Sequence, residues 1–180
     1  KEAILIDSVL EKVERDYKLL KEMGLTVKYF VETHIHADHF SGIYQFVKKF
    51  PDAKTIYGKN SGVDKMIVKN VTLVKEGDKI TFGKDDRLYL DVIETPGHTA
   101  GCSTYYFPGK KFKGCDDKLF TGDALLIRGS GRTDFQGGDN KTLFKSINKL
   151  YSKYSDETLV YPGHDYNGNL VSTIGEEKKF

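Results

Sequence analysis

Three of the five histidines in the chain fall within one short stretch, Thr33-His34-Ile35-His36-Ala37-Asp38-His39. In an extended segment alternate side chains share a face, so His34 and His36 should project to the same side. Asp38 and His39 follow where an apolar stripe typical of a helix begins. Imidazole nitrogens and carboxylate oxygens are ligands for zinc and iron, so this pattern favours a metal site over scattered surface histidines.

The remaining two histidines, His98 and His164, each follow a Pro-Gly pair, in PGHTAG and PGHD. Asp123 ends the run FTGD, which also has turn character. Taken singly, each of these residues fits an ordinary turn, because Pro-Gly and Gly-Asp pairs mark turns by themselves. Their occurrence together with the first cluster indicates one shared site instead.

The hydrophobic pattern places these motifs at the ends of strands. Apolar residues at helical spacing predict helices, and short β-branched or aromatic runs between turn residues predict strands. The expected helices are 9–23, 40–50 and 139–154, and the expected strands are 3–6, 27–33, 55–57, 71–74, 79–82, 88–95, 103–107, 118–127 and 157–162. Loops at strand ends can aim several side chains at one point, as a metal site requires.

Composition and charge narrow the classes of function. The net charge of +2 is the small difference between 28 basic and 26 acidic residues, which argues against a nucleic-acid partner. No apolar run approaches the ~20 residues of a membrane-spanning helix, so we expect no membrane partner. Cys102 and Cys115 lack metal-ligand spacing and are expected to be free thiols. We expect one domain over residues 1–180, with residues of its N-terminal strand missing upstream, as any targeting peptide would be.

The four motifs together carry a family resemblance. THIHADH, PGHTAG, TGD and PGHD match, in order and approximate spacing, the metal motifs of the metallo-β-lactamase superfamily. The resemblance covers nearly the whole chain. It implies an α+β fold in which two sheets pack face to face between outer helices, the αββα sandwich, with the metal at one edge of the sheets.

Within the superfamily, TGDALLIRGSGRTDFQ and YPGHDYNG resemble the persulfide dioxygenases of the ethylmalonic-encephalopathy type. Such enzymes oxidise glutathione persulfide with O2 and water to sulfite and glutathione, in sulfide catabolism, at one Fe(II) per chain. The resemblance implies that His34, His98 and Asp123 bind the iron and that other positions stay open for substrate and O2.

The resemblance also implies roles for neighbouring residues. Residues that orient the ligands, or that could bind a second metal, would be His36, Asp38, His39 and His164. Residues that could hold the glutathione carboxylates are Arg128, Arg132 and Tyr166. Ser130 is a departure, because many persulfide dioxygenases carry cysteine there, and Cys102 is expected to be a small core residue rather than a reactive thiol. Family membership further implies the mitochondrial matrix in a eukaryote or the cytoplasm in a bacterium, and allows a homodimer.

A glyoxalase II type hydrolase of S-lactoylglutathione is the alternative function. Every ligand for its two metals is present, so ligand residues alone do not separate the two activities. The run GRTDFQ fits the dioxygenases better, and the short segment after His164 leaves no room for the helical glutathione-binding domain of glyoxalase II, unless the protein continues further. A non-catalytic metal-binding module is a third possibility, against which the complete ligand set argues.

Overall fold

The computed structural model describes residues 1–64, 68 and 70–180 and contains two β-sheets with helices on their outer faces. The strands are β1 (Glu2–Ile6), β2 (Thr26–Val31), β3 (Lys54–Gly58), β4 (Val71–Val74), β5 (Lys79–Phe82), β6 (Leu88–Glu94), β7 (Ser103–Phe107), β8 (Lys118–Gly122), β9 (Leu159–Pro162) and β10 (Ser172–Thr173). The helices are α1 (Val13–Glu22), α2 (Ile43–Lys49), α3 (Asn140–Lys153) and α4 (Ile174–Glu177), with short 3-10 turns at Leu10–Lys12, Lys84–Asp86 and Gly109–Lys111. The predicted αββα sandwich is confirmed.

The first sheet has the order β1-β2-β3-β4, and all its strands are parallel. One face packs on α1 and α2 through Leu20, Phe30 and Phe46, which are almost fully buried. The other face turns Ile4 and Ile6 of β1 towards the second sheet. This alternation, apolar on both faces, is what a strand buried between two layers requires.

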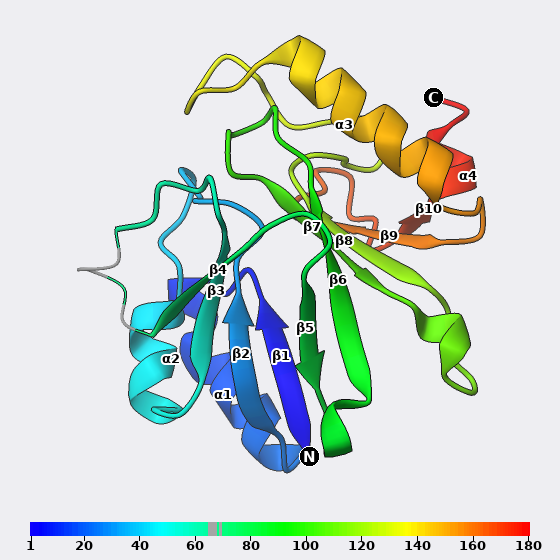
Figure 1. Cartoon of the computed structure of the whole chain (residues 1–180). Coiled ribbons are helices and arrows are strands. Elements are labelled where there is room, and N and C mark those ends of the chain that lie inside the picture. Colours follow the sequence, from blue (N-terminus) through cyan, green and yellow to red (C-terminus); the bar gives the residue numbers. More distant parts are fainter. Residues whose placement is uncertain (65–67, 69) are drawn as a thin grey trace.

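The second sheet has the order β10-β9-β8-β7-β6-β5 and is antiparallel except for the β8/β9 pair. Its inner face contributes Leu90, Val92 and Tyr105 to the core between the sheets. Its outer face packs on α3 and α4, where Leu150 and Ile174 are fully buried. Figure 1 shows α3 and α4 on this side and α1 and α2 on the opposite side of the molecule.

Two element boundaries differ from the sequence prediction. The helix expected from residue 40 begins at Ile43, because Ser41 forms an antiparallel bridge with Val9. Hydrogen bonds from Leu10 N–H to Phe40 O and from Gly42 N–H to Ser8 O flank this bridge. The strand expected over 118–127 ends at Gly122, where the chain turns with φ +52°. In the part of the chain that the structure describes, no helix has both the length and the hydropathy to cross a bilayer.

The layer of helices on the first sheet can be tested with two neighbouring leucines on α1. Leu20 is 8% exposed and packs on the sheet, whereas Leu19 is 53% exposed. We expect Leu20→Ala to lower the free energy of unfolding by about 2–5 kcal/mol, because it leaves a cavity. Leu19→Ala should change it by less than ~0.5 kcal/mol. Urea unfolding followed by circular dichroism measures both, and equal losses would contradict the packing described.

Candidate metal centre

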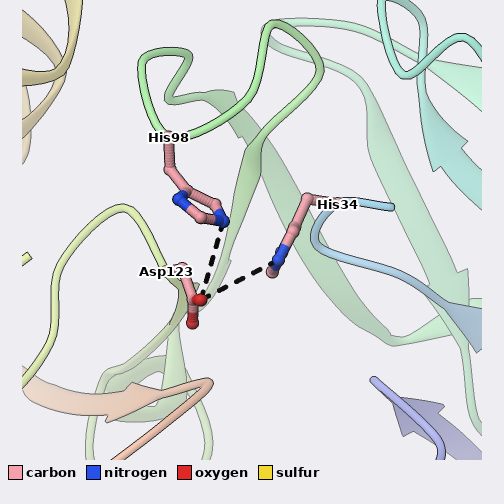
Figure 2. Close-up of side chains that lie close together, drawn as sticks. All are labelled: His34, His98 and Asp123. Carbon is pink, nitrogen blue, oxygen red and sulfur yellow. Dashed lines mark ion pairs between the residues drawn. The ribbon is translucent and has the colours of Figure 1, made fainter. Parts of the chain in front are cut away.

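His34, His98 and Asp123 come together from three different strand ends (Figure 2). His34 follows β2, His98 follows β6 and Asp123 follows β8. The Asp123 Oδ2 atom lies 3.9 Å from His34 Nε2 and 3.6 Å from His98 Nε2, and one ligand atom from each residue lies within 4.8 Å of the others. Their side chains are only 1% to 11% exposed. The structure therefore places the three predicted iron ligands in one enclosed cluster.

Hydrogen bonds fix which nitrogen of each histidine faces the cluster. The Thr33 hydroxyl donates to Asp7 Oδ2 at 2.8 Å, so it can only accept from His34 Nδ1, 2.9 Å away. His98 Nδ1 lies 2.7 Å from the Arg132 carbonyl oxygen, an acceptor, and so carries a hydrogen. In a neutral imidazole the other nitrogen, Nε2, then holds the lone pair that a metal needs.

Burial keeps His34 neutral. Burial, together with the nearby His36, lowers the pKa of His34 to about 4. The pKa of Asp123 is also lowered, because the hydrogen bond and charge of His164 outweigh the effect of burial. A neutral imidazole and an ionised carboxylate are the forms that bind a metal ion.

Gly122 and Gly131 lie so close to the cluster that neither position has room for a side chain. A Cβ on Gly131 would lie 2.4 Å from the Asp123 carbonyl oxygen and 2.8 Å from His98 Nδ1. A Cβ on Gly122 would lie 2.4 Å from the Thr33 hydroxyl oxygen. The loop after β8 can therefore pack against Asp123 and His98 only because these positions lack side chains.

A second set of side chains is joined to the first through Asp123. His164 Nδ1 lies 2.7 Å from Asp123 Oδ1, and its Nε2 lies 3.0 Å from Asp38 Oδ2. The same Asp38 oxygen lies 3.0 Å from His39 Nδ1. The hydrogen bond to Asp123 raises the pKa of His164 to about 9, so this ring donates from both nitrogens at neutral pH. Three of the four residues predicted for the second set, Asp38, His39 and His164, thus form a hydrogen-bonded chain next to the three ligands.

His36 faces away from this chain towards two carboxylates. Its Nε2 lies 3.0 Å from Glu32 Oε2 and 3.4 Å from Asp7 Oδ1, and its side chain is 4% exposed. Burial opposes a charge on His36, but the contacts with Asp7 and Glu32 raise its pKa to about 10. Burial raises the pKa of Glu32.

Three residues that contact the histidines of the site, or each other, were not predicted from the sequence: Asp7, Glu32 and Thr33. Asp7 and Glu32 directly follow β1 and β2, the two adjacent parallel strands that end at this edge. A carboxylate immediately after a buried strand was the available signal. It was overlooked because neither residue belongs to a histidine motif.

The predicted glutathione-binding residues already have partners in the structure. The Arg128 guanidinium lies 2.9 Å from Glu176, and Arg132 makes a bidentate contact with Asp134 at 2.7 and 3.0 Å. Tyr166 is 86% exposed and stacks on His164 with ring centroids 6.2 Å apart. Cys102 is buried and its sulfur contacts Thr99, as a core residue would, whereas Cys115 is exposed.

A cavity of about 370 Å³ opens beside the histidines. Its lining includes His34, His36, His39, Phe40 and Tyr57. This volume is in the range of small-molecule sites, so a small molecule can lie beside His34.

Comparisons with known proteins agree with this geometry. The sequence profile described as the metallo-beta-lactamase superfamily matches residues 1–164. The human protein named persulfide dioxygenase ETHE1, mitochondrial, is 42% identical over 178 residues, which are 99% of this chain and 65% of the human protein. A hydroxyacylglutathione hydrolase of Brucella abortus is 37% identical over 156 residues, covering 83% of this chain and 52% of that protein.

Among solved structures, the crystal structure of ETHE1 from Myxococcus xanthus superimposes with a TM-score of 0.86 at 40% identity, covering 99% of this chain and 72% of that one. The chain thus spans about two thirds of the length of its curated ETHE1 relatives. With the profile match, the sandwich fold and the ligand cluster at the edge of the sheets, the chain belongs to the metallo-beta-lactamase superfamily, in which it resembles ETHE1 proteins.

Proposed function

We propose that this chain oxidises glutathione persulfide with O2 and water to glutathione and sulfite at a single Fe(II). The balanced reaction is GSSH + O2 + H2O giving GSH, sulfite and two protons. The observation that carries the proposal is the enclosed cluster of two histidines and one carboxylate, His34, His98 and Asp123. Identity of 41% to 42% to mammalian proteins named persulfide dioxygenase ETHE1 supports it.

The cluster fits one metal ion. Ligands held about 2.1 Å from one ion lie roughly 3.0–3.4 Å apart, so the separations of 3.6 and 3.9 Å need only a small contraction. Two histidines and one carboxylate with open positions are the usual ligand set of non-haem Fe(II) enzymes that use O2. Bound there, Fe(II) would supply the redox chemistry that joins O2 to the terminal sulfur.

The protein's own residues orient the ligands and admit the substrate. His164 engages Asp123 Oδ1, which leaves Oδ2 to face His34 and His98. Asp7, through Thr33, keeps the lone pair of His34 directed into the cluster. The cavity beside the histidines gives the persulfide a route to the open side of the site.

Arg128, Arg132 and Tyr166 are the proposed contacts for glutathione. Each guanidinium would exchange its present carboxylate partner, Glu176 or Asp134, for a carboxylate of glutathione. Both arginine pairs lie at the surface, where ion pairs are weak, so such an exchange costs little. Tyr166 is unburied beside His164 and can cover the bound peptide.

A two-metal hydrolase of S-lactoylglutathione is the second candidate. The observation in its favour is the group formed by His36, Asp38 and His39, whose ligand atoms also lie within 4.8 Å of one another. Two observations weigh against it. Asp38 is hydrogen-bonded to His39 and His164, and identity to the Brucella hydrolase is lower, over less of the chain.

We further propose a mitochondrial matrix location if the source is eukaryotic and a cytoplasmic one otherwise. The mammalian relatives are named mitochondrial, and a bacterial ETHE1 is also similar. We also propose a homodimer, which a measurement of the molar mass in solution would test.

The activity can be tested directly with Fe(II)-loaded protein. On addition of glutathione persulfide in aerated buffer, we expect O2 uptake with an equal amount of sulfite. His98→Ala and Asp123→Ala should lose the activity almost completely, because each removes a ligand. An oxygen electrode and a sulfite assay measure the result, with Lys141→Ala on the exposed side of α3 as a control that should stay active. No uptake, together with hydrolysis of S-lactoylglutathione, would favour the two-metal hydrolase.

The role of Thr33 can be tested by metal affinity. Thr33→Val keeps the shape but removes the hydroxyl that holds His34 Nδ1 and links it to Asp7. Loss of such an orienting partner typically weakens metal binding by ~10–100-fold. Competition with a chromophoric chelator would measure this. Thr99→Val, which removes a hydroxyl bonded to Cys102, is the matched control. Unchanged affinity in Thr33→Val would show that the hydroxyl does not orient His34.

A further inference from the structure

We propose that Glu32, together with Asp7, is a positioning residue that holds His36 outside the coordination shell of the metal bound by His34, His98 and Asp123. The proposal rests on the one-metal function above and explains how a chain with the residues for a larger ligand set keeps only three.

Asp7, Glu32 and His36 form a compact cluster behind the ligands, with ligand-type atoms within 4.8 Å of one another. His36 Nε2 faces Glu32 Oε2 at 3.0 Å and Asp7 Oδ1 at 3.4 Å. These are ion-pair contacts without hydrogen-bond geometry, and they place His36 Nε2 beside the two carboxylates. The attraction between the ring and the carboxylates therefore opposes movement of His36 towards the metal.

The remaining groups hold the two carboxylates in place. The Ser41 hydroxyl donates to Glu32 Oε1 at 2.8 Å, which leaves Oε2 for His36. Thr33 donates its backbone N–H to Asp7 Oδ1 at 2.7 Å and its hydroxyl to Oδ2. Glu32 is 1% exposed, and its Oε2 atom has no hydrogen bond among the described residues. His36 Nε2, 3.0 Å away, is the ion-pair partner of this buried oxygen.

Moving His36 to the metal would leave both carboxylates without that ring. A buried carboxylate that loses its only cationic or N–H partner is strongly destabilised, because no water replaces the contact. This cost opposes the entry of His36 into the ligand set. The cost depends on Glu32 more than on Asp7, since Asp7 retains both of its bonds from Thr33.

The restraint matters because His36 is close to the site. Its ring centroid lies 4.2 Å from that of His34, and both residues leave the same strand end. Without the carboxylates, a modest rotation would bring an imidazole nitrogen within reach of the metal. It would then occupy a position that substrate or O2 needs. Glu32 thus preserves the open side of the metal site.

The test counts imidazoles on the bound metal by X-ray absorption of the Fe(II)-loaded protein, which needs no turnover. We expect two in the native protein, those of His34 and His98. In Glu32→Ala a third should appear, because the carboxylate that holds His36 away is gone. In Glu32→Ala/His36→Ala the third imidazole should be lost again. That reversal separates release of His36 from general disturbance of the fold.

Two further variants complete the design. Ser41→Ala removes the partner of the other Glu32 oxygen and should leave two imidazoles. Glu32→Gln is isosteric, so it tests the charge if the alanine variant does not fold, and a third imidazole is expected there too. Only two imidazoles in the folded Glu32 variants, or three in the native protein, would overturn the proposal. Native protein that shows two imidazoles but does not oxidise persulfide would refute the proposed activity and leave the role of Glu32 standing.

Discussion

The division of the Asp123 carboxylate between two sets of partners is the constraint on which the site depends. One oxygen faces His34 and His98, and the other is held by His164. Since His164 also contacts Asp38, the orientation of the ligand carboxylate is tied to the histidine motif after β2. A single residue after β8 thus joins loops from both sheets. The sandwich must bring the ends of β2, β6, β8 and β9 to one edge for this to occur.

That edge concentrates charged groups in a poorly solvated place, and hydrogen bonds hold several of them. Asp7 receives two hydrogen bonds from Thr33, and Glu32 receives one from Ser41. Tyr105, fully buried between the sheets, donates its hydroxyl to the Glu32 backbone carbonyl at 2.8 Å. Because buried polar groups are tolerated only when paired, these partners fix the loop conformations as much as the apolar core does. Rigidity of the ligands therefore originates in neighbours that never touch the metal.

Much of the fold and the central cluster could be predicted from the sequence. Strand and helix periodicity located most elements, and the family resemblance of the four motifs implied that His34, His98 and Asp123, which the structure brings together, are the ligands. The start of α2 was misplaced because pairing of residues 40–42 with residues 8–10 is a long-range interaction that local periodicity does not report. Asp7 was missed for a similar reason. Its contact with Thr33 spans 26 positions in the chain and exists only because β1 and β2 are neighbours in the sheet.

The types of the ligand residues do not show whether the site binds one metal or two, whereas their hydrogen bonds bear on this question directly. The same histidines and aspartates suit one metal or two, so the difference must lie in which atoms are already engaged. In this chain Asp38 is bonded to His39 and His164, and His36 turns towards Glu32. A second ion would have to displace a hydrogen from His164, both of whose nitrogens contact carboxylates, whereas the first needs none displaced from His34 Nε2. The carboxylates of Asp7 and Glu32 can therefore determine whether one metal or two is bound. A sequence motif that lists only the ligand residues does not include them.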